Sequence, residues 1–251
     1  MITLSKVSKS FQSQGDGAVR RVLSNIDLNV PKGCLYGLIG PGASGKSVLL
    51  KIIAGLFRPD QGRVVVGGED ITSASELMLQ ETRRQFGMLF QNNALFDHLS
   101  VADNIAFPLR RLFDLPAHNV ASQVAERLAR VGLTGFESRL PGALSGGQKK
   151  RVGVARATVT RAPIVLYDEP AAGLDPVTSQ KIFDLLRAEQ QEYQTTVVMV
   201  SSDLDRLLTV TDRIGMIVQG ELVFDGSTDG ARASRHPVVR QFLDGLDEGP
   251  L

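Results

Sequence analysis

The sequence predicts an α/β fold in which helices cover a mixed sheet, with an antiparallel N-terminal subdomain and a helical insertion. Two observations lead to this prediction. Short apolar runs alternate with segments of helical periodicity, as expected where helices pack on a sheet. Strand signals are also concentrated in the first third of the chain, vanish between residues 92 and 140, and return after Pro141.

The N-terminal third contains the strand signals of the antiparallel subdomain. Strands are expected at Ile2–Val7, Val22–Val30 and Arg63–Val66, with turns at Gly15-Asp16-Gly17 and Gly67-Gly68. Leu35–Ile39 is predicted to be a buried strand that leads into a glycine-rich loop, and a helix is expected after this loop.

The insertion and the C-terminal half complete the predicted fold. Amphipathic helices are expected at Val101–Phe113 and Asn119–Val131. Val165–Tyr167 and Thr195–Val200 are runs typical of strands buried on both faces of a parallel sheet. The tail is expected to pair Ile214–Val218 with Leu222–Phe224 and to end in short helices. We therefore expect one domain over residues 1–251, with a core at 1–91 and 141–225, a helical subdomain at 92–140 and a tail at 226–251.

Composition and charge exclude several classes of protein. The formal net charge of the 251 residues is +1, which offers nucleic acid no charged surface. The single cysteine, Cys34, rules out an internal disulfide, fits a reducing compartment and is expected to be a small buried residue. The chain has no run of 18 apolar residues, and we expect neither a secretory signal nor a membrane span.

A glycine-rich segment between the predicted strand and helix carries the first chemical signal. Glycines allow backbone N–H groups to surround phosphate oxygens, and the start of the following helix favours negative charge. Lys46 would contact the β- and γ-phosphates of a nucleotide, and the Ser47 hydroxyl would bind Mg²⁺. The alternative is a glycine turn before an ordinary helix, and the strand that precedes the loop argues against it. The segment matches G-x-x-x-x-G-K-[ST] at Gly40, Pro41, Gly42, Ala43, Ser44, Gly45, Lys46 and Ser47.

Two adjacent carboxylates follow another predicted strand. Asp168 and Glu169 end the apolar run that begins at Ile164. At this strand end, Asp168 is expected to hold Mg²⁺, and Glu169 is expected to polarise the water that attacks the γ-phosphate. Paired acids also occur in solvated turns, but a phosphate loop in the same chain favours the catalytic interpretation.

A second helix start has the features of an anion site. Ser145 is a good N-cap, and the two glycines behind it leave backbone donors exposed. In isolation this segment is a capped helix. Because the chain already has one complete phosphate loop, the spare helix start makes sense if it closes over a nucleotide held by another copy. The residues of this half-site are Ser145, Gly146, Gly147 and Gln148.

Five motifs, in their order and spacing, make the whole chain resemble an ABC transporter ATPase. The resemblance implies a P-loop NTPase core with the ABC ATPase fold, ATP and Mg²⁺ as cofactors, and two ATP molecules enclosed between two head-to-tail copies. The motifs are Walker A at Gly40–Ser47, the glutamine loop at Phe90-Gln91, the signature at Leu144–Gln148, Walker B with Glu169, and the D-loop at Gly173-Leu174-Asp175-Pro176.

The resemblance also implies individual roles. Phe11 occupies the position where the family stacks an aromatic ring on adenine, although the residues alone fit a place in the strand core equally well. Gln91 would contact Mg²⁺ or the attacking water and would pass the state of the site to a membrane partner. The half-site at Ser145 would complete the site of the second copy, and Asp175 would cross the dimer interface.

A narrower resemblance concerns Phe90–Phe96, Val101–Arg110 and the tail Val239–Gly245 with Gly249-Pro250, which look like the ATPases of Mla/Mce-type lipid transporters. It implies a cytoplasmic subunit, on the inner face of the cell membrane, that drives lipid or phospholipid transport through a permease. An MCE-domain lipid-binding protein and a small STAS-type subunit would be further partners, and nucleic acid would not. The alternative is that the first two stretches are ordinary core of the helical insertion.

One position departs from the family pattern. Ser202 stands where the family carries a histidine, and the three histidines present, His98, His118 and His236, are expected to be solvated. Serine donates one hydrogen bond and cannot become cationic, so the change should cost about 3 kcal/mol of transition-state stabilisation, or about a hundredfold in rate. Because Glu169 and the signature are retained, we expect a slow or partner-dependent ATPase.

Three alternatives remain open at this point. The chain could be an ATP-gated structural subunit that dimerises without turnover, an ABC ATPase outside transport, or the ATPase of an importer of amino acids or another small solute. A role outside transport is disfavoured because the chain has neither a coiled-coil insert nor a tandem copy.

Overall fold

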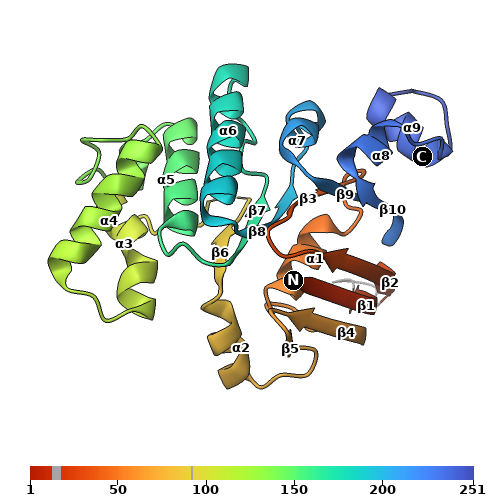
Figure 1. Cartoon of the computed structure of the whole chain (residues 1–251), viewed down its shortest axis with the longest axis horizontal. Coiled ribbons are helices and arrows are strands. Elements are labelled where there is room, and N and C mark those ends of the chain that lie inside the picture. The colour runs from red at the N-terminus through yellow and green to blue at the C-terminus, as the bar shows by residue number, and fades with distance from the viewer. Residues whose placement is uncertain (13–17, 92) are drawn as a thin grey trace. The chain divides into compact units, whose positions relative to one another are not determined.

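A computed structural model describes residues 1–12, 18–91 and 93–251. The predicted turn at Gly15-Asp16-Gly17 and the residue Asn92 lie outside the described residues. The chain divides into two compact units, drawn in Figure 1. Unit 1 comprises Met1–Arg83 and Thr196–Leu251, and unit 2 comprises Arg84–Thr195.

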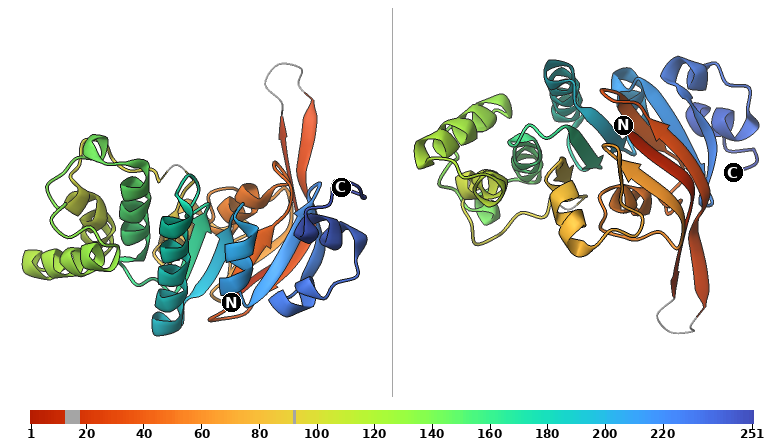
Figure 2. Two further views of the ribbon diagram at one scale, coloured as in Figure 1. Left: turned by 90° about the horizontal axis from the view of Figure 1, so that it is seen from above. Right: turned by 60° about the horizontal axis from the view of Figure 1, so that its bottom comes forward.

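An antiparallel sheet forms the N-terminal part of unit 1. Its strands are β1 (Ile2–Gln12), β2 (Val19–Val30), β4 (Gln61–Val66) and β5 (Glu69–Asp70), in the order β2-β1-β4-β5. In β2 every second residue from Ile26 to Val30 is buried, which is the pattern of a strand with one face against the core. Figure 2 shows β1 and β2 continuing together beyond β4 as a hairpin. The three predicted strands are therefore confirmed as β1, β2 and β4, and each is longer than predicted.

Parallel strands form the second layer of unit 1. β3 (Leu35–Ile39) lies between β8 (Thr196–Val200) and β9 (Arg213–Val218), and β10 (Glu221–Ser227) runs antiparallel to β9. All residues of β3 and β8 are buried, as predicted for strands covered on both faces. The helices of this unit are α1 (Lys46–Ile53), α2 (Glu76–Arg83), α7 (Leu204–Val210), α8 (Thr228–Arg232) and α9 (Pro237–Asp244).

Unit 2 combines two parallel strands with a helical part. β6 (Phe86–Leu89) pairs with β7 (Ile164–Asp168). The helical elements are α3 (Val101–Leu112), α4 (Ala117–Arg130), the 3₁₀ turn η1 (Pro141–Ala143), α5 (Gly146–Thr158) and α6 (Pro176–Tyr193). The two helices predicted for the insertion are confirmed as α3 and α4, to within two residues at each end.

Two further observations bear on the predictions from the sequence. Cys34 is buried beside β3, as expected. None of the helices in the described residues combines the length and the apolar character that crossing a membrane requires.

Candidate active site

The glycine-rich loop of unit 1 connects β3 to α1, as predicted. Two of its glycines adopt left-handed backbone conformations, with φ of 136° at Gly40 and 105° at Gly45. A Cβ at Gly40 would lie 2.0 Å from the carbonyl oxygen of Ile217, and a Cβ at Gly45 would lie 2.8 Å from that of Val22. The loop is therefore pressed between β9 and β2, and no other residue type fits at these two positions.

Lys46 is the first residue of α1, and its side chain folds back over the loop. The ammonium group donates to the carbonyl oxygens of Gly40 at 2.8 Å and Pro41 at 2.7 Å, and it lies 3.2 Å from the Ser44 hydroxyl. These contacts hold a positive charge at the centre of a loop whose following helix also favours anions. The loop thus holds a positive charge at a helix start, as the binding of a phosphate group requires.

A cavity of about 500 Å³ opens beside this loop. Arg20 and Arg21 of β2 form one wall, and Gln219 and Gly220 of the β9–β10 turn form another. The sequence analysis does not single out these four residues, although two adjacent arginines on a strand near the loop are a visible signal. Gly40, Pro41 and Gly42 are not among the lining residues. The complete lining is Arg20, Arg21, Val22, Ala43, Ser44, Gly45, Lys46, Ser47, Val48, Gln219 and Gly220.

Phe11 lies in the hairpin next to one wall of the cavity. It is paired with Arg20 across the β1–β2 ladder, so the two side chains share a face of the sheet. Its ring packs edge-on against Phe57, with centroids 5.4 Å apart, and the ammonium group of Lys9 lies 5.4 Å from the ring centroid. Phe11 does not itself line the cavity. Its role in stacking on adenine stays a prediction.

The predicted pair of acids lies at the end of β7 in unit 2. Asp168 is the last residue of the strand and is 5% exposed. Glu169 follows in a left-handed conformation, with φ of 54°. Such a backbone is uncommon for a residue other than glycine, asparagine or aspartate, and strain of this kind concentrates at functional sites.

A buried lysine that the sequence analysis missed accompanies these acids. Lys150 of α5 is 4% exposed, and its ammonium group donates to the carbonyl oxygen of Gln91 at 2.7 Å. Burial lowers the pKa of Lys150, and the charges of Glu169 and Asp168 oppose this shift. Unit 2 therefore holds three predicted site residues near Lys150: its ammonium group is hydrogen-bonded to Gln91, and the charges of Asp168 and Glu169 act on it.

The signature segment begins α5 with the predicted cap. The Ser145 hydroxyl accepts a hydrogen bond from the Gln148 N–H at 3.3 Å, and the Gln148 side chain accepts one from the Ser145 N–H at 2.9 Å. This reciprocal capping box confirms Ser145 as the N-cap. Ser145 and Gly146 are exposed, and Gly147 is half-buried.

Ser202 follows β8 and is exposed. Its carbonyl oxygen accepts a hydrogen bond from Leu204 N–H at 3.1 Å, and the neighbouring Asp203 caps α7. The histidines His98, His118 and His236 are all exposed, as expected.

Three features together define a nucleotide-hydrolysing cassette. They are a phosphate loop that follows a parallel strand, a capped helix start with two glycines, and a strand that ends in acidic residues. The family model described as ABC transporter matches residues 23–172. The chain therefore belongs to the ABC transporter family, and it is an ATPase of that family. Cassettes of this family bind ATP, dimerise and work with membrane permeases.

Relatives and solved structures agree with this assignment. The probable ribonucleotide transport ATP-binding protein mkl of Mycobacterium tuberculosis (strain ATCC 25618 / H37Rv) is 39% identical over 250 residues, which are 100% of this chain and 68% of the relative. The intermembrane phospholipid transport system ATP-binding protein MlaF of Escherichia coli (strain K12) is 37% identical over 232 residues, which are 92% of this chain and 86% of the relative. The dimeric, post-hydrolysis structure of the ATP-binding cassette MJ0796 with ADP and Pi aligns with a TM-score of 0.85 and 31% identity, covering 91% of this chain and 99% of that one.

Proposed function

We propose that this chain is the ATPase subunit of a lipid transporter, and that it hydrolyses ATP as a head-to-tail dimer to move phospholipid through a membrane permease. The observation that carries the proposal is the similarity to the phospholipid transport ATP-binding protein MlaF over 92% of this chain. The loop around Lys46 supports the hydrolytic part, since it holds a cation at the start of a helix, where a polyphosphate is favoured.

Each predicted site residue has a role in this proposal that follows from its chemistry. Lys46 and the loop N–H groups bind the β- and γ-phosphates, and the exposed half-site at Ser145 covers the nucleotide of the second copy. Glu169 polarises the attacking water, and its carboxylate accepts the proton that the water loses. Asp175, whose carboxylate caps α6 by accepting from Val177 and Thr178 at 3.0 Å each, faces the second copy through the exposed turn before that helix.

The donor set fits Mg²⁺, which prefers oxygen ligands in small numbers. Ser47 offers a hydroxyl, Asp168 a carboxylate and Gln91 an amide oxygen. When bound, the ion neutralises charge on the phosphate oxygens. Ser47 and the buried Asp168 would hold it, and Gln91 would sense it.

A groove in unit 2 supports docking of a permease. It encloses about 330 Å³ next to the glutamine loop, and it includes the ring of Phe107, which is 43% exposed. An apolar groove of this kind suits an apolar segment of a membrane protein. The contact would place the chain on the inner face of the membrane. The lining is Phe86, Gly87, Met88, Phe90, Ala94, Phe96, Phe107, Pro108, Arg156, Ala157 and Thr160.

The choice of lipid over another cargo depends on the stretches Phe90–Phe96, Val101–Arg110 and Val239–Gly245. These stretches resemble the lipid subfamily, and the first two contribute to the groove. The relative named for ribonucleotide transport is 39% identical, against 37% for MlaF, so a small solute is the competing cargo. An MCE-domain protein and a STAS-type subunit belong to the proposal as further partners.

The test has two parts. ATPase rates of the wild type, Glu169→Gln and Ser202→His, each with and without the permease, test hydrolysis. We expect a low wild-type rate, a further loss in Glu169→Gln, and a gain of up to about a hundredfold in Ser202→His. A wild-type rate equal to that of Glu169→Gln under every condition would instead establish the second candidate, an ATP-gated structural subunit, which the serine at position 202 favours.

The second part tests the cargo. The subunit is purified with its membrane partner and reconstituted in vesicles, and ATP-dependent transfer of a fluorescent phospholipid is compared with uptake of a labelled ribonucleotide. We expect phospholipid transfer and co-purification of an MCE-domain protein. Ribonucleotide uptake, or co-purification of a soluble solute-binding protein, would refute the lipid assignment and leave the ATPase assignment intact.

A further inference from the structure

One face of the signature helix α5 contacts the glutamine loop. Lys150, Gly153 and Arg156 are spaced by three residues, so they lie on one side of the helix. Lys150 donates to the carbonyl oxygen of Gln91 at 2.7 Å. Arg156 donates to the carbonyl oxygens of Asn93 at 2.5 Å and Ala94 at 2.8 Å.

Close packing accompanies these hydrogen bonds. A Cβ at Gly153 would lie 2.7 Å from the side chain of Leu89 and 3.4 Å from that of Asn93, so a larger residue would push the loop away from the helix. Asn93 and Ala94 are both left-handed, with φ of 61° and 49°. Such conformations persist where the surroundings fix them, and here the charged donors of Arg156 supply part of that restraint.

Lys150 and Arg156 also interact with groups outside the glutamine loop. The Lys150 ammonium group lies within the electrostatic influence of Glu169 and Asp168. The Arg156 guanidinium lies 5.7 Å from the centroid of the Phe96 ring, in the groove proposed for the permease. Both contacts lie within unit 2, as does the start of α5 at the signature.

We propose that Lys150 and Arg156 are positioning residues that fasten the glutamine loop to the signature helix, so that Gln91 and the half-site at Ser145 move as one body. In the same arrangement Lys150 supplies a counter-charge to the acids at the end of β7. The inference rests on the proposed function, because it assigns consequences to Gln91 and Glu169. It predicts that the two residues affect turnover and leave ATP affinity unchanged, since neither is among the residues that line the cavity around Lys46.

The experiment compares Lys150→Met, Lys150→Arg and Lys149→Met in the full chain. Lys149 is the matched control, because it carries the same charge one residue earlier on α5 and donates to no loop carbonyl in the described structure. The measurements are kcat, KM and the equilibrium Kd for ATP. Hydrogen–deuterium exchange over residues 90–96 and the melting temperature complete the set.

For Lys150→Met we expect kcat to fall at least about tenfold, because a loop misplaced by an ångström is enough to cost a hundredfold. The Kd for ATP should stay within about twofold, and exchange over residues 90–96 should accelerate. Lys150→Arg, which keeps a charged donor, should retain most of the wild-type kcat. Lys149→Met should resemble the wild type in every measurement.

Arg156→Met provides an independent second variant, with accelerated exchange over the same residues as its expected result. The inference is wrong if Lys150→Met and Lys149→Met have the same kcat, or if exchange over residues 90–96 is unchanged in both Lys150→Met and Arg156→Met. Failure of the proposed function looks different, because the wild type and Glu169→Gln would then have equal rates.

Discussion

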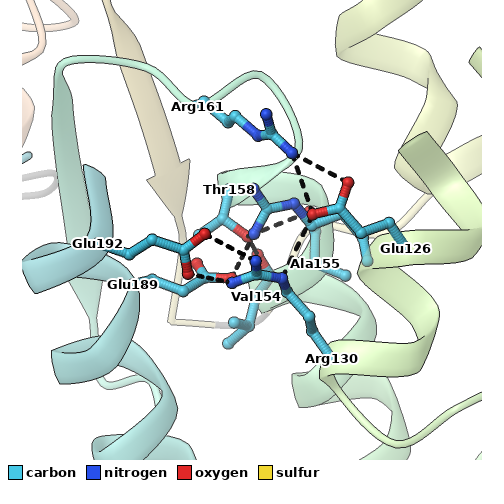
Figure 3. Close-up of polar contacts among 9 residues, drawn as sticks. Glu126, Arg130, Val154, Ala155, Thr158, Arg161, Glu189 and Glu192 are labelled. Atoms are coloured by element: carbon cyan, nitrogen blue, oxygen red, sulfur yellow. Dashed lines mark hydrogen bonds and ion pairs between the residues drawn. The ribbon is translucent and has the colours of Figure 1, made fainter. Parts of the chain in front are cut away.

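A buried ion pair connects α4 to α6, and mutating it tests how unit 2 is held together. The side chains of Arg127 and Glu189 are 2% and 6% exposed, and the guanidinium donates to the carboxylate. Figure 3 shows the network around them, in which Arg130 reaches Glu192 at 2.7 and 2.8 Å. The outer pair is partly exposed, with side-chain exposures of 29% and 47%.

The perturbation is to remove each partner of the buried pair in turn. Arg127→Met leaves the Glu189 carboxylate buried without its partner, and Glu189→Met does the same to the guanidinium. Breaking a buried pair from one side costs about 3–5 kcal/mol. The double variant, with two apolar side chains of similar length, should cost much less, within about 1–2 kcal/mol of the wild type. The coupling energy between the two sites is therefore expected to be at least about 3 kcal/mol.

A buried donor in the pair is a further reason to expect a small loss of stability in the double variant. The Nη2 atom of Arg127 is buried and has no hydrogen-bond partner within the described part of the chain. A buried donor left without a partner costs about 1–3 kcal/mol, and the double variant removes this cost. The same reasoning gives the control, since Arg130→Met should cost only about 0–1 kcal/mol if the outer pair behaves as a surface ion pair.

The assay is urea denaturation of the four proteins of this cycle and of Arg130→Met, followed by circular dichroism. Burial raises the pKa of Glu189, and the neighbouring arginines oppose this shift. In Arg127→Met the main opposing charge is lost, so the folded state binds a proton more readily than the unfolded state does. The free energy of unfolding of Arg127→Met should therefore fall as pH rises above 4.5, the ordinary pKa of glutamate. It should increase again when the pH is lowered back to 4.5. Single variants that cost no more than Arg130→Met, or a double variant that costs the sum of both, would refute the reasoning.

Three further predictions concern other parts of the chain. Gly40→Ala should abolish ATP binding in a nucleotide-binding assay, because the added methyl group would lie 2.0 Å from the carbonyl oxygen of Ile217. Ser145→Ala should lower the free energy of unfolding by about 1 kcal/mol in urea, since it removes the N-cap of α5. The hydrogen bond from Arg130 holds the pKa of Glu192 at about 2, below its ordinary 4.5, so the stability that it contributes is present above pH 4.5 and is lost as pH falls toward 2. Glu192→Gln should flatten this part of the pH–stability profile, and high salt should do the same to the wild type.

The sequence predicts the strands of unit 1 well, for a physical reason. β3 and β8 are covered on both faces, so their residues form apolar runs that stand out from the neighbouring polar segments. β6 was not predicted. It is only four residues long and includes Gly87, whose Cβ position lies 2.0 Å from the carbonyl oxygen of Ala157. That glycine reflects close packing of α5, which is a tertiary contact without a local signal.

The candidate site shows the same division between local and tertiary information. The phosphate loop is contiguous, and its residues are recognisable because each meets a local demand of phosphate binding. Lys150 is one of two adjacent lysines with no distinguishing neighbours in the sequence, and only the fold buries it against the carbonyl oxygen of Gln91. Arg20 likewise becomes a wall of the cavity because the fold brings β2 against the loop at Gly45, which the sequence does not specify.

The ATPase rate of Ser202→His can be interpreted because other residues hold the backbone around position 202. The Ser201 hydroxyl accepts from the Asp203 N–H at 3.1 Å, and Asp203 caps α7 and pairs with Arg206 at 2.5 Å. Ser202 itself is exposed, and none of these three contacts uses its side chain, so a larger side chain there leaves them in place. A change in ATPase rate on Ser202→His therefore reports the chemistry of an imidazole and not a rearranged turn. If the rate does not rise, the missing histidine is not what limits turnover.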